Sequence, residues 1–199
     1  TRNFHNWARK YQIKDGLADR MTLLNNWEAT YFDFNEDKLI DLFGEAQKLG
    51  VDMFLLDDGW DVPRGTHPVN DAAIESFGSL ELARDRFPSF PGTPAQRLRG
   101  VNEALKARGW RGAGLWVSAQ ACGEGFVSGF WSREKSAEYW RTRLRWSREA
   151  GIGYWKIDWG CRQFDPQWRQ LLEELGEQYC VNRIDGAKCI YRDFGDHDV

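Results

Sequence analysis

The chain has 199 residues, 29% of them charged, and a formal net charge of -3. This length is enough for one domain with a sizeable core. The near balance of charges gives no basis for nucleic-acid binding, and no apolar run approaches the roughly 20 residues that span a bilayer. The first residues lack the apolar core of a signal peptide, which favours a cytoplasmic location. They also lack an initiating Met, which suggests a start inside a longer protein.

The cysteine, histidine and tryptophan content limits the kind of site that the chain can hold. The four cysteines form no C-x-x-C pair and there are only three histidines. We therefore expect no zinc site, and nothing else in the sequence implies a metal or an organic cofactor. Eleven tryptophans are the unusual feature of the composition. Because indole has a large apolar face and a polar edge, we expect roughly two to four of them to face a ligand and the others to fill the core.

The first 20 residues are expected to form a short helix and a linker before the main domain, which spans residues 21–199. Phe4, Trp7 and Tyr11 have helical spacing. The dipeptide Asp15-Gly16 indicates a turn.

Segments with strand and helix patterns alternate through the main domain. Strands are predicted at 21–28, 51–57, 112–117, 154–158 and, more weakly, 187–191. Helices are predicted at 37–49, 93–108, 133–150 and 165–179. The first of these helices should have Asn35 as its N-cap, Leu49 in its apolar stripe and Gly50 as its stop. The long loop over 61–92 is of a kind that is usually functional.

The alternation, without hairpin signals, predicts parallel strands joined by right-handed helical crossovers. In an α/β barrel the carboxyl ends of such strands share one rim, and that rim holds the catalytic groups. Three of the predicted strand ends carry polar and aromatic residues together: Asn26-Trp27-Glu28, Asp57-Asp58-Gly59-Trp60 and Lys156-Ile157-Asp158-Trp159.

Lys156 and Asp158 are two residues apart, so on a strand they point to the same side. A cation and an acid on an apolar strand are costly to bury unless they are paired or functional. A structural Lys–Asp pair is the alternative to a functional site here.

The three strand ends together suit a sugar. Adjacent carboxylates bind vicinal hydroxyls through charge-assisted hydrogen bonds, and tryptophan rings stack on the apolar face of a pyranose. A carboxylate beside a cation stays ionised and can attack an anomeric carbon.

Segments 25–34, 55–60 and 155–158 resemble the melibiase-type α-galactosidases, which are retaining glycoside hydrolases with a TIM-barrel catalytic domain. The resemblance covers roughly residues 20–160. It implies that 21–199 is the N-terminal part of a TIM (β/α)8 barrel with only the first five βα units present. The expected state is therefore a piece cut from a longer protein, and the alternative is an open parallel sheet that associates with other chains.

The resemblance also implies roles for single residues. Asp158 falls on the nucleophile, and Lys156 falls on a lysine that contacts sugar hydroxyls. The residues expected to contact the sugar are Trp27, Asp57, Asp58, Trp60, Trp116, Lys156, Trp159 and Cys161.

The implied reaction is hydrolysis of terminal α-linked galactosides by double displacement, with a carbohydrate as the only partner besides a possible oligomer or the remainder of a longer chain. A non-catalytic carbohydrate-binding relative that lacks the acid/base and a transglycosidase of the same fold are the alternatives. The family places its general acid/base on a strand after the fifth, so that residue stays unassigned. Asp193 is the candidate that the chain offers, together with Asp196 and Asp198, although all three follow the fifth strand closely.

Cys122 and Cys161 follow the third and fourth predicted strands. Some α-galactosidases that resemble this chain place a disulfide between these two loops. Two free thiols are favoured here, and a Cys122–Cys161 bond is the alternative.

Overall fold

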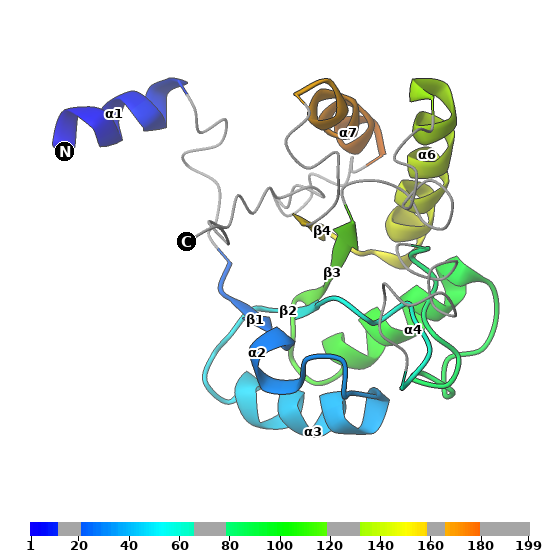
Figure 1. Ribbon diagram of the computed structural model, residues 1–199. Coiled ribbons are helices and arrows are strands. Elements are labelled where there is room, and N and C mark those ends of the chain that lie inside the picture. The colour runs from blue at the N-terminus through cyan, green and yellow to red at the C-terminus, as the bar shows by residue number, and fades with distance from the viewer. Residues whose placement is uncertain (12–20, 66–78, 119–131, 159–165, 180–199) are drawn as a thin grey trace.

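The computed structural model describes residues 1–11, 21–65, 79–118, 132–158 and 166–179 (Figure 1). The strand predicted at 187–191, the four cysteines and Asp193 lie outside these ranges.

Four parallel strands form the centre of the described fold. They are β1 (Leu23–Asn25), β2 (Met53–Leu56), β3 (Gly112–Ser118) and β4 (Tyr154–Asp158). Their order in the sheet is the order in the chain, and each neighbouring pair is parallel. The predicted α/β arrangement with parallel strands is therefore confirmed.

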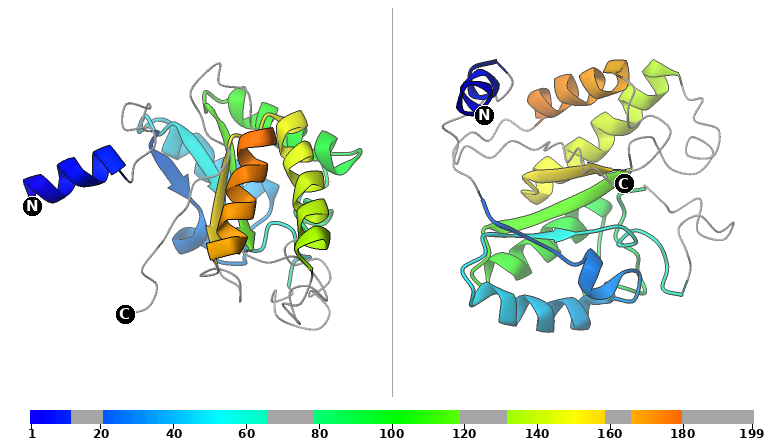
Figure 2. Two further views of the ribbon diagram at one scale, coloured as in Figure 1. Left: turned by 90° about the horizontal axis from the view of Figure 1, so that it is seen from above. Right: turned by 60° about the vertical axis from the view of Figure 1, so that its left-hand side comes forward.

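A helix follows each strand in the chain, and these helices cover one side of the sheet (Figures 1 and 2). They are α3 (Glu36–Gln47), α4 (Pro94–Lys106), α6 (Arg133–Ala150) and α7 (Pro166–Tyr179). Helix α4 packs against α6, and α6 packs against α7. Helix α1 (Arg2–Tyr11) lies apart from the sheet and exposes Phe4, Trp7 and Tyr11. None of the helices in the described ranges is long and apolar enough to cross a membrane.

Helix starts follow the signals in the sequence, with side-chain oxygens accepting the first free N–H groups. The side chain of Asn35 accepts from the Lys38 N–H at the start of α3. Thr93 and Gln96 form a reciprocal capping box at the start of α4. The end of α3 differs from the prediction, because the helix stops at Gln47 and Leu49 is 82% exposed.

The first strand is shorter than predicted. It ends at Asn25, and a one-turn helix, α2 (Trp27–Thr30), replaces the expected strand residues up to Glu28. The reason is local hydrogen bonding, since the Asn25 side-chain carbonyl accepts the Trp27 N–H at 2.7 Å. Such side-chain to backbone bonds compete with strand pairing. The Tyr31 N–H then bonds to the Trp27 carbonyl at 2.8 Å and closes the turn.

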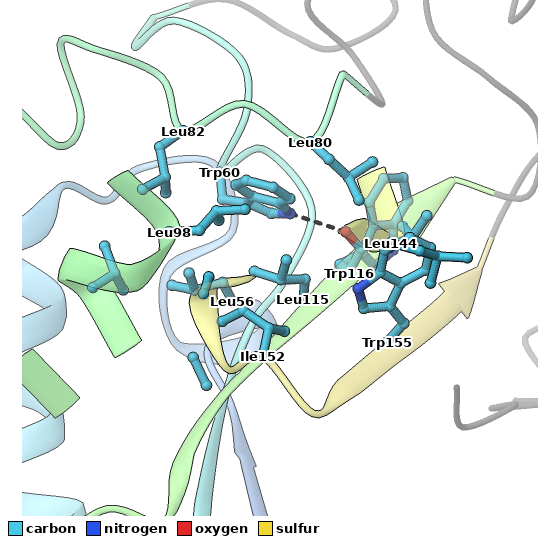
Figure 3. Packing of buried hydrophobic residues seen from close by; sticks show 14 of the residues in the cluster. Leu56, Trp60, Leu80, Leu82, Leu98, Leu115, Trp116, Leu144, Ile152 and Trp155 are labelled. Carbon is cyan, nitrogen blue, oxygen red and sulfur yellow. Dashed lines mark hydrogen bonds between the residues drawn. The ribbon is translucent and has the colours of Figure 1, made fainter. Parts of the chain in front are cut away.

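The main core lies between the sheet and the helices. Figure 3 shows Leu56 and Leu115, from neighbouring strands, beside Ile152. Trp155 faces the same layer and donates its indole N–H to the Ser147 hydroxyl of α6 at 3.0 Å. Each fully buried Leu contributes on the order of 1.5–3 kcal/mol. The opposite face of the sheet carries a smaller buried cluster of Met53, Leu55 and Tyr154.

A carboxylate joins the amino ends of three strands. Asp52 accepts the Thr22 main-chain N–H at 2.8 Å and the Thr22 hydroxyl at 2.9 Å, and it lies 3.8 Å from the Arg111 guanidinium. These partners, the Thr22 N–H above all, hold the pKa of Asp52 below its usual range. The contacts fix the start of β1 and β3 relative to β2.

A buried arginine holds the segment that follows β2. Arg86 donates to the carbonyls of Val62 at 2.6 Å, Phe32 at 2.8 Å and Phe34 at 2.7 Å. Burial lowers the pKa of this guanidinium. Arg86 thereby ties the loop after α2 to the loop after β2, and both loops lie next to the carboxyl ends of the strands.

Two mid-helix glycines should respond in opposite ways to alanine. A Cβ at Gly44 in α3 would meet nothing within 4 Å, whereas a Cβ at Gly100 in α4 would lie 2.6 Å from the Phe90 ring. Gly44→Ala should stabilise the fold by up to about 1 kcal/mol, through helix propensity. Gly100→Ala should destabilise it by about 1–3 kcal/mol, through overpacking. Urea denaturation of both variants checks this, and equal shifts in one direction would contradict it.

The Asp52 network should make part of the stability depend on pH. Folding depresses the Asp52 pKa, so its stabilisation is present above the unfolded-state value of about 3.9 and is lost as pH falls through the lower folded-state value. Asp52→Asn should therefore lower the free energy of unfolding at neutral pH, and the gap to wild type should close under acid conditions. Urea titrations of both proteins at a series of pH values measure this difference in stability. A difference that stays the same at every pH would contradict the prediction.

Candidate sugar-binding site

A buried ion pair joins the carboxyl ends of β2 and β4. Lys156 Nζ lies 3.1 Å from Asp57 Oδ2, and both side chains are buried. Lys156 pairs in register with Trp116 of β3, so the lysine reaches across that strand to the acid that follows β2. Asp57 and Lys156, which were predicted to lie on one rim, are thus brought together, and their pair links β2 and β4 across β3.

The Asp57 carboxylate has further partners. Its Oδ2 also accepts from Asn25 Nδ2 at 2.5 Å, and its Oδ1 accepts the Asp58 N–H at 2.8 Å. These bonds and the ion pair therefore fix the orientation of the carboxylate at the carboxyl edge of the sheet.

Asn26 fixes the backbone at the same place. Its side-chain carbonyl accepts the Asp57 N–H at 2.8 Å, and its amide donates to the Thr30 hydroxyl at 2.9 Å. Asn26 is fully buried, so an unpaired amide there would be costly. These bonds attach α2 to the end of β2. Asn26 was predicted as part of one of the polar strand ends, but neither Asn25 nor Asn26 was among the residues expected to contact the sugar, and their hydrogen bonds to Asp57 were not predicted.

The turn after Asp58 needs a glycine. Gly59 has a φ of +95°, and a Cβ there would lie 2.6 Å from the Phe32 ring. L-residues rarely adopt that conformation. The glycine lets the chain turn sharply beneath Phe32, so that Asp58 is left half-buried at the rim while Trp60 enters the core.

The expected tryptophan contacts divide into two groups. Trp27 is half-buried and makes edge contacts with Tyr31 and Phe32, at ring separations of 5.2 and 5.1 Å. Trp60 and Trp116 are buried in the main core, and the Trp60 indole donates to the Trp116 carbonyl at 3.0 Å. In this structure only Trp27 of the three offers ring surface to a ligand, because the others pack among apolar side chains.

Asp158 is the last residue of β4, where its backbone pairs with Ser118 of β3. Its position in the chain is therefore the end of a strand, two residues beyond Lys156. Its side chain lies outside the described part of the structure, as do Trp159, Cys161 and the Cys122–Cys161 pairing. Among the residues that the structure describes, no three His, Cys, Asp or Glu side chains are grouped to hold a metal ion.

The described chain is thus an α/β protein with a parallel sheet, and its polar site lies at the carboxyl ends of the strands. Solved structures share this fold. The α-galactosidase AgaA of Geobacillus stearothermophilus matches 89% of this chain with a TM-score of 0.60 and 21% identity, over 29% of its own chain. The α-galactosidase of Lactobacillus brevis matches 85% with a TM-score of 0.55 and 22% identity, over 26% of its own chain.

The family follows from the sequence comparison. The melibiase family model matches residues 1–124, more than half of the chain, and the chain belongs to that family. AgaA of Geobacillus stearothermophilus is 55% identical over 122 residues, which are 60% of this chain and 15% of AgaA. Alpha-galactosidase Mel36A of Lactobacillus acidophilus is 44% identical over 85 residues, which are 43% of this chain and 10% of that protein. The aligned part of the chain is thus a small fraction of its curated relatives.

Removal of the cation alone should be strongly destabilising. Lys156→Met leaves the Asp57 carboxylate buried without its ammonium partner, and breaking a buried pair in this way typically costs about 3–5 kcal/mol. Lys48 is the matched control, because its ion pair with Glu45 at 2.7 Å is exposed, and exposed pairs contribute little. Urea denaturation should show a large loss for Lys156→Met and almost none for Lys48→Met. Similar losses of unfolding free energy in the two variants would contradict the role of Lys156 as the partner of a buried carboxylate.

Proposed function

We propose that this chain belongs to a retaining α-galactosidase that hydrolyses terminal α-linked galactosides by double displacement. The observation that carries the proposal is the Asp57–Lys156 pair at the carboxyl edge of a parallel sheet, in a chain of the melibiase family. AgaA, a relative 55% identical over its aligned segment, is named an α-galactosidase.

The proposed architecture is the first part of a TIM (β/α)8 barrel. The described strands run parallel in chain order, as consecutive barrel strands do. A fifth strand at 187–191, the extent of the barrel part over 21–199 and the linker role of residues 1–20 remain predictions.

The substrate is proposed to lie over the rim made by β1, β2 and β4. Asp58, half-buried beside Asp57, is placed to accept sugar hydroxyls, and Lys156 offsets the charge of Asp57 through their ion pair. The exposed surface of Trp27 provides an apolar face for the pyranose ring. Solved structures of AgaA variants contain 1-deoxygalactonojirimycin, stachyose or raffinose, which supports a galactose-configured sugar as the occupant.

Asp158 is proposed as the nucleophile. A carboxylate oxygen would bond to the anomeric carbon while the glycosidic C–O bond breaks, and a second acid would give its proton to the leaving oxygen. Water would then release the sugar and return the nucleophile to its carboxylate form. The two carboxyl groups should be about 5–5.5 Å apart in a retaining site. The acid/base stays unassigned, with Asp193 as the candidate.

Covalent trapping tests the proposal on the full-length protein. A mechanism-based 2-deoxy-2-fluoro-galactosyl fluoride should add one sugar to wild type, and peptide mapping should place it on Asp158. Asp158→Ala should take up no label and lose nearly all turnover of an aryl α-galactoside. Asp41→Ala, on the exposed side of α3, is the matched control and should behave as wild type. A label on another residue, or Asp158→Ala turnover within about tenfold of wild type, would overturn the assignment.

A further inference from the structure

The Asn25 side chain lies between the Asp57 carboxylate and the start of helix α2. Its amide nitrogen donates to Asp57 Oδ2 at 2.5 Å, and its carbonyl oxygen accepts the Trp27 N–H at 2.7 Å. The second bond fixes the orientation of the amide, since the backbone N–H needs an acceptor and only the oxygen can provide one. The nitrogen must therefore face the acid.

The Asp57 carboxylate has its partners arranged around Asn25. Oδ1 receives the Asp58 N–H, and Oδ2 is shared by the Asn25 amide and the Lys156 ammonium. Without the amide, the carboxylate would keep its bonds to Asp58 and Lys156 but lose the bond that draws Oδ2 toward β1, so it could turn away from β1. The lysine would then follow its partner, because the two charges are buried together.

We propose that Asn25 is a positioning residue for the sugar site: it holds Asp57 in the orientation that sets Lys156 and Asp58 for the substrate, and it couples that acid to the helix turn that carries Trp27. This role rests on the proposed function for its effect on substrate, but the contact with Asp57 stands independently of it. Asn25 is required as a donor, so a side chain of equal size that only accepts cannot replace it.

Asn25→Asp keeps the size and shape of the side chain but removes the amide N–H donor, so it tests the donor alone. It would put two carboxylates in direct contact, and such a pair cannot ionise fully, so one acid retains its proton at a raised pKa. The protonated form restores an O–H donor toward Asp57. Among the side chains that the structure describes, the other charged groups at this edge are Lys156 on β4, Asp58 after β2 and the exposed Glu28 on α2, and Asp158 is the last residue of β4. Lys156 opposes the rise in pKa but cannot neutralise two carboxylates.

Asn35→Asp is the matched control. Asn35 acts only as an acceptor, for the Lys38 N–H that caps α3, and Asp serves that purpose equally well. The same atoms and the same charge change are thus introduced where no donor is needed.

The first measurement is the pH dependence of stability, which needs no substrate. In Asn25→Asp the acid pair has a raised pKa in the folded state, so folding is favoured when the proton is bound and this stabilisation is lost as pH rises. The stability deficit against wild type should grow from mildly acid to slightly alkaline pH. Asn35→Asp should show no such growth, and a deficit in Asn25→Asp that does not change with pH would overturn the contact.

The second measurement is KM for an aryl α-galactoside over the same pH range, with the full-length protein. At neutral pH, Asn25→Asp and Asn25→Ala should each raise KM by about tenfold or more, the loss typical of one charged hydrogen bond. Asn25→Asp alone should recover toward wild type as pH falls. An unchanged KM, or equal losses in both variants at every pH, would overturn the positioning role. An inactive wild type would defeat the proposed function, while the stability measurement would still decide whether Asn25 holds Asp57.

Discussion

The buried ion pair between Asp57 and Lys156 is the constraint on which the carboxyl edge of this sheet depends. Two charges inside an apolar sheet are tolerated only with good geometry and further hydrogen bonds, and the neighbouring residues supply both. The lysine comes from β4 and the acid follows β2, with β3 between them. Strand order, register and the Asn25 amide of β1 must therefore all be in place before the pair is stable.

Arg86, Gly59 and Trp60 fix the chain segments next to this edge. Arg86 fixes the loops that follow α2 and β2 through three backbone carbonyls. Gly59 turns the chain so that Trp60 enters the core directly after the acidic pair. The tryptophan anchors the segment by packing and by its bond to the Trp116 carbonyl. In the sequence, the two acidic residues therefore lie directly before the buried Trp60, and hydrogen bonds from Asn25 and Asn26 fix the first of them.

Much of this arrangement could be predicted from sequence periodicity. The alternation of strands and helices, the caps at Asn35 and Thr93 and the parallel order of the strands all follow from local patterns. The rim residues Asp57 and Lys156 follow from their places at strand ends. These features depend on near neighbours in the chain or on the general chirality of crossovers.

What could not be predicted depends on contacts between distant segments. The end of β1 was missed because the Asn25 side chain, whose bonds reach both Trp27 and Asp57, overrides the strand pattern. The sequence also did not show which tryptophans are exposed. Trp27 and Trp60 both lie close to acidic residues in the sequence, and they differ only in how they pack in the fold. A strand-end aromatic has the same pattern whether it lines a ligand site or fills a core.

We propose that the polar strand ends form one sugar-binding rim. Calorimetric titration of the full-length protein with 1-deoxygalactonojirimycin tests it most directly, in wild type and in Asp58→Ala, whose half-buried side chain lies at the rim. Wild type should bind the inhibitor at one site, and the variant should bind it with an affinity at least about tenfold weaker, as expected for a lost charged hydrogen bond. Equal affinities in the two proteins, or no binding by a folded wild type, would contradict it.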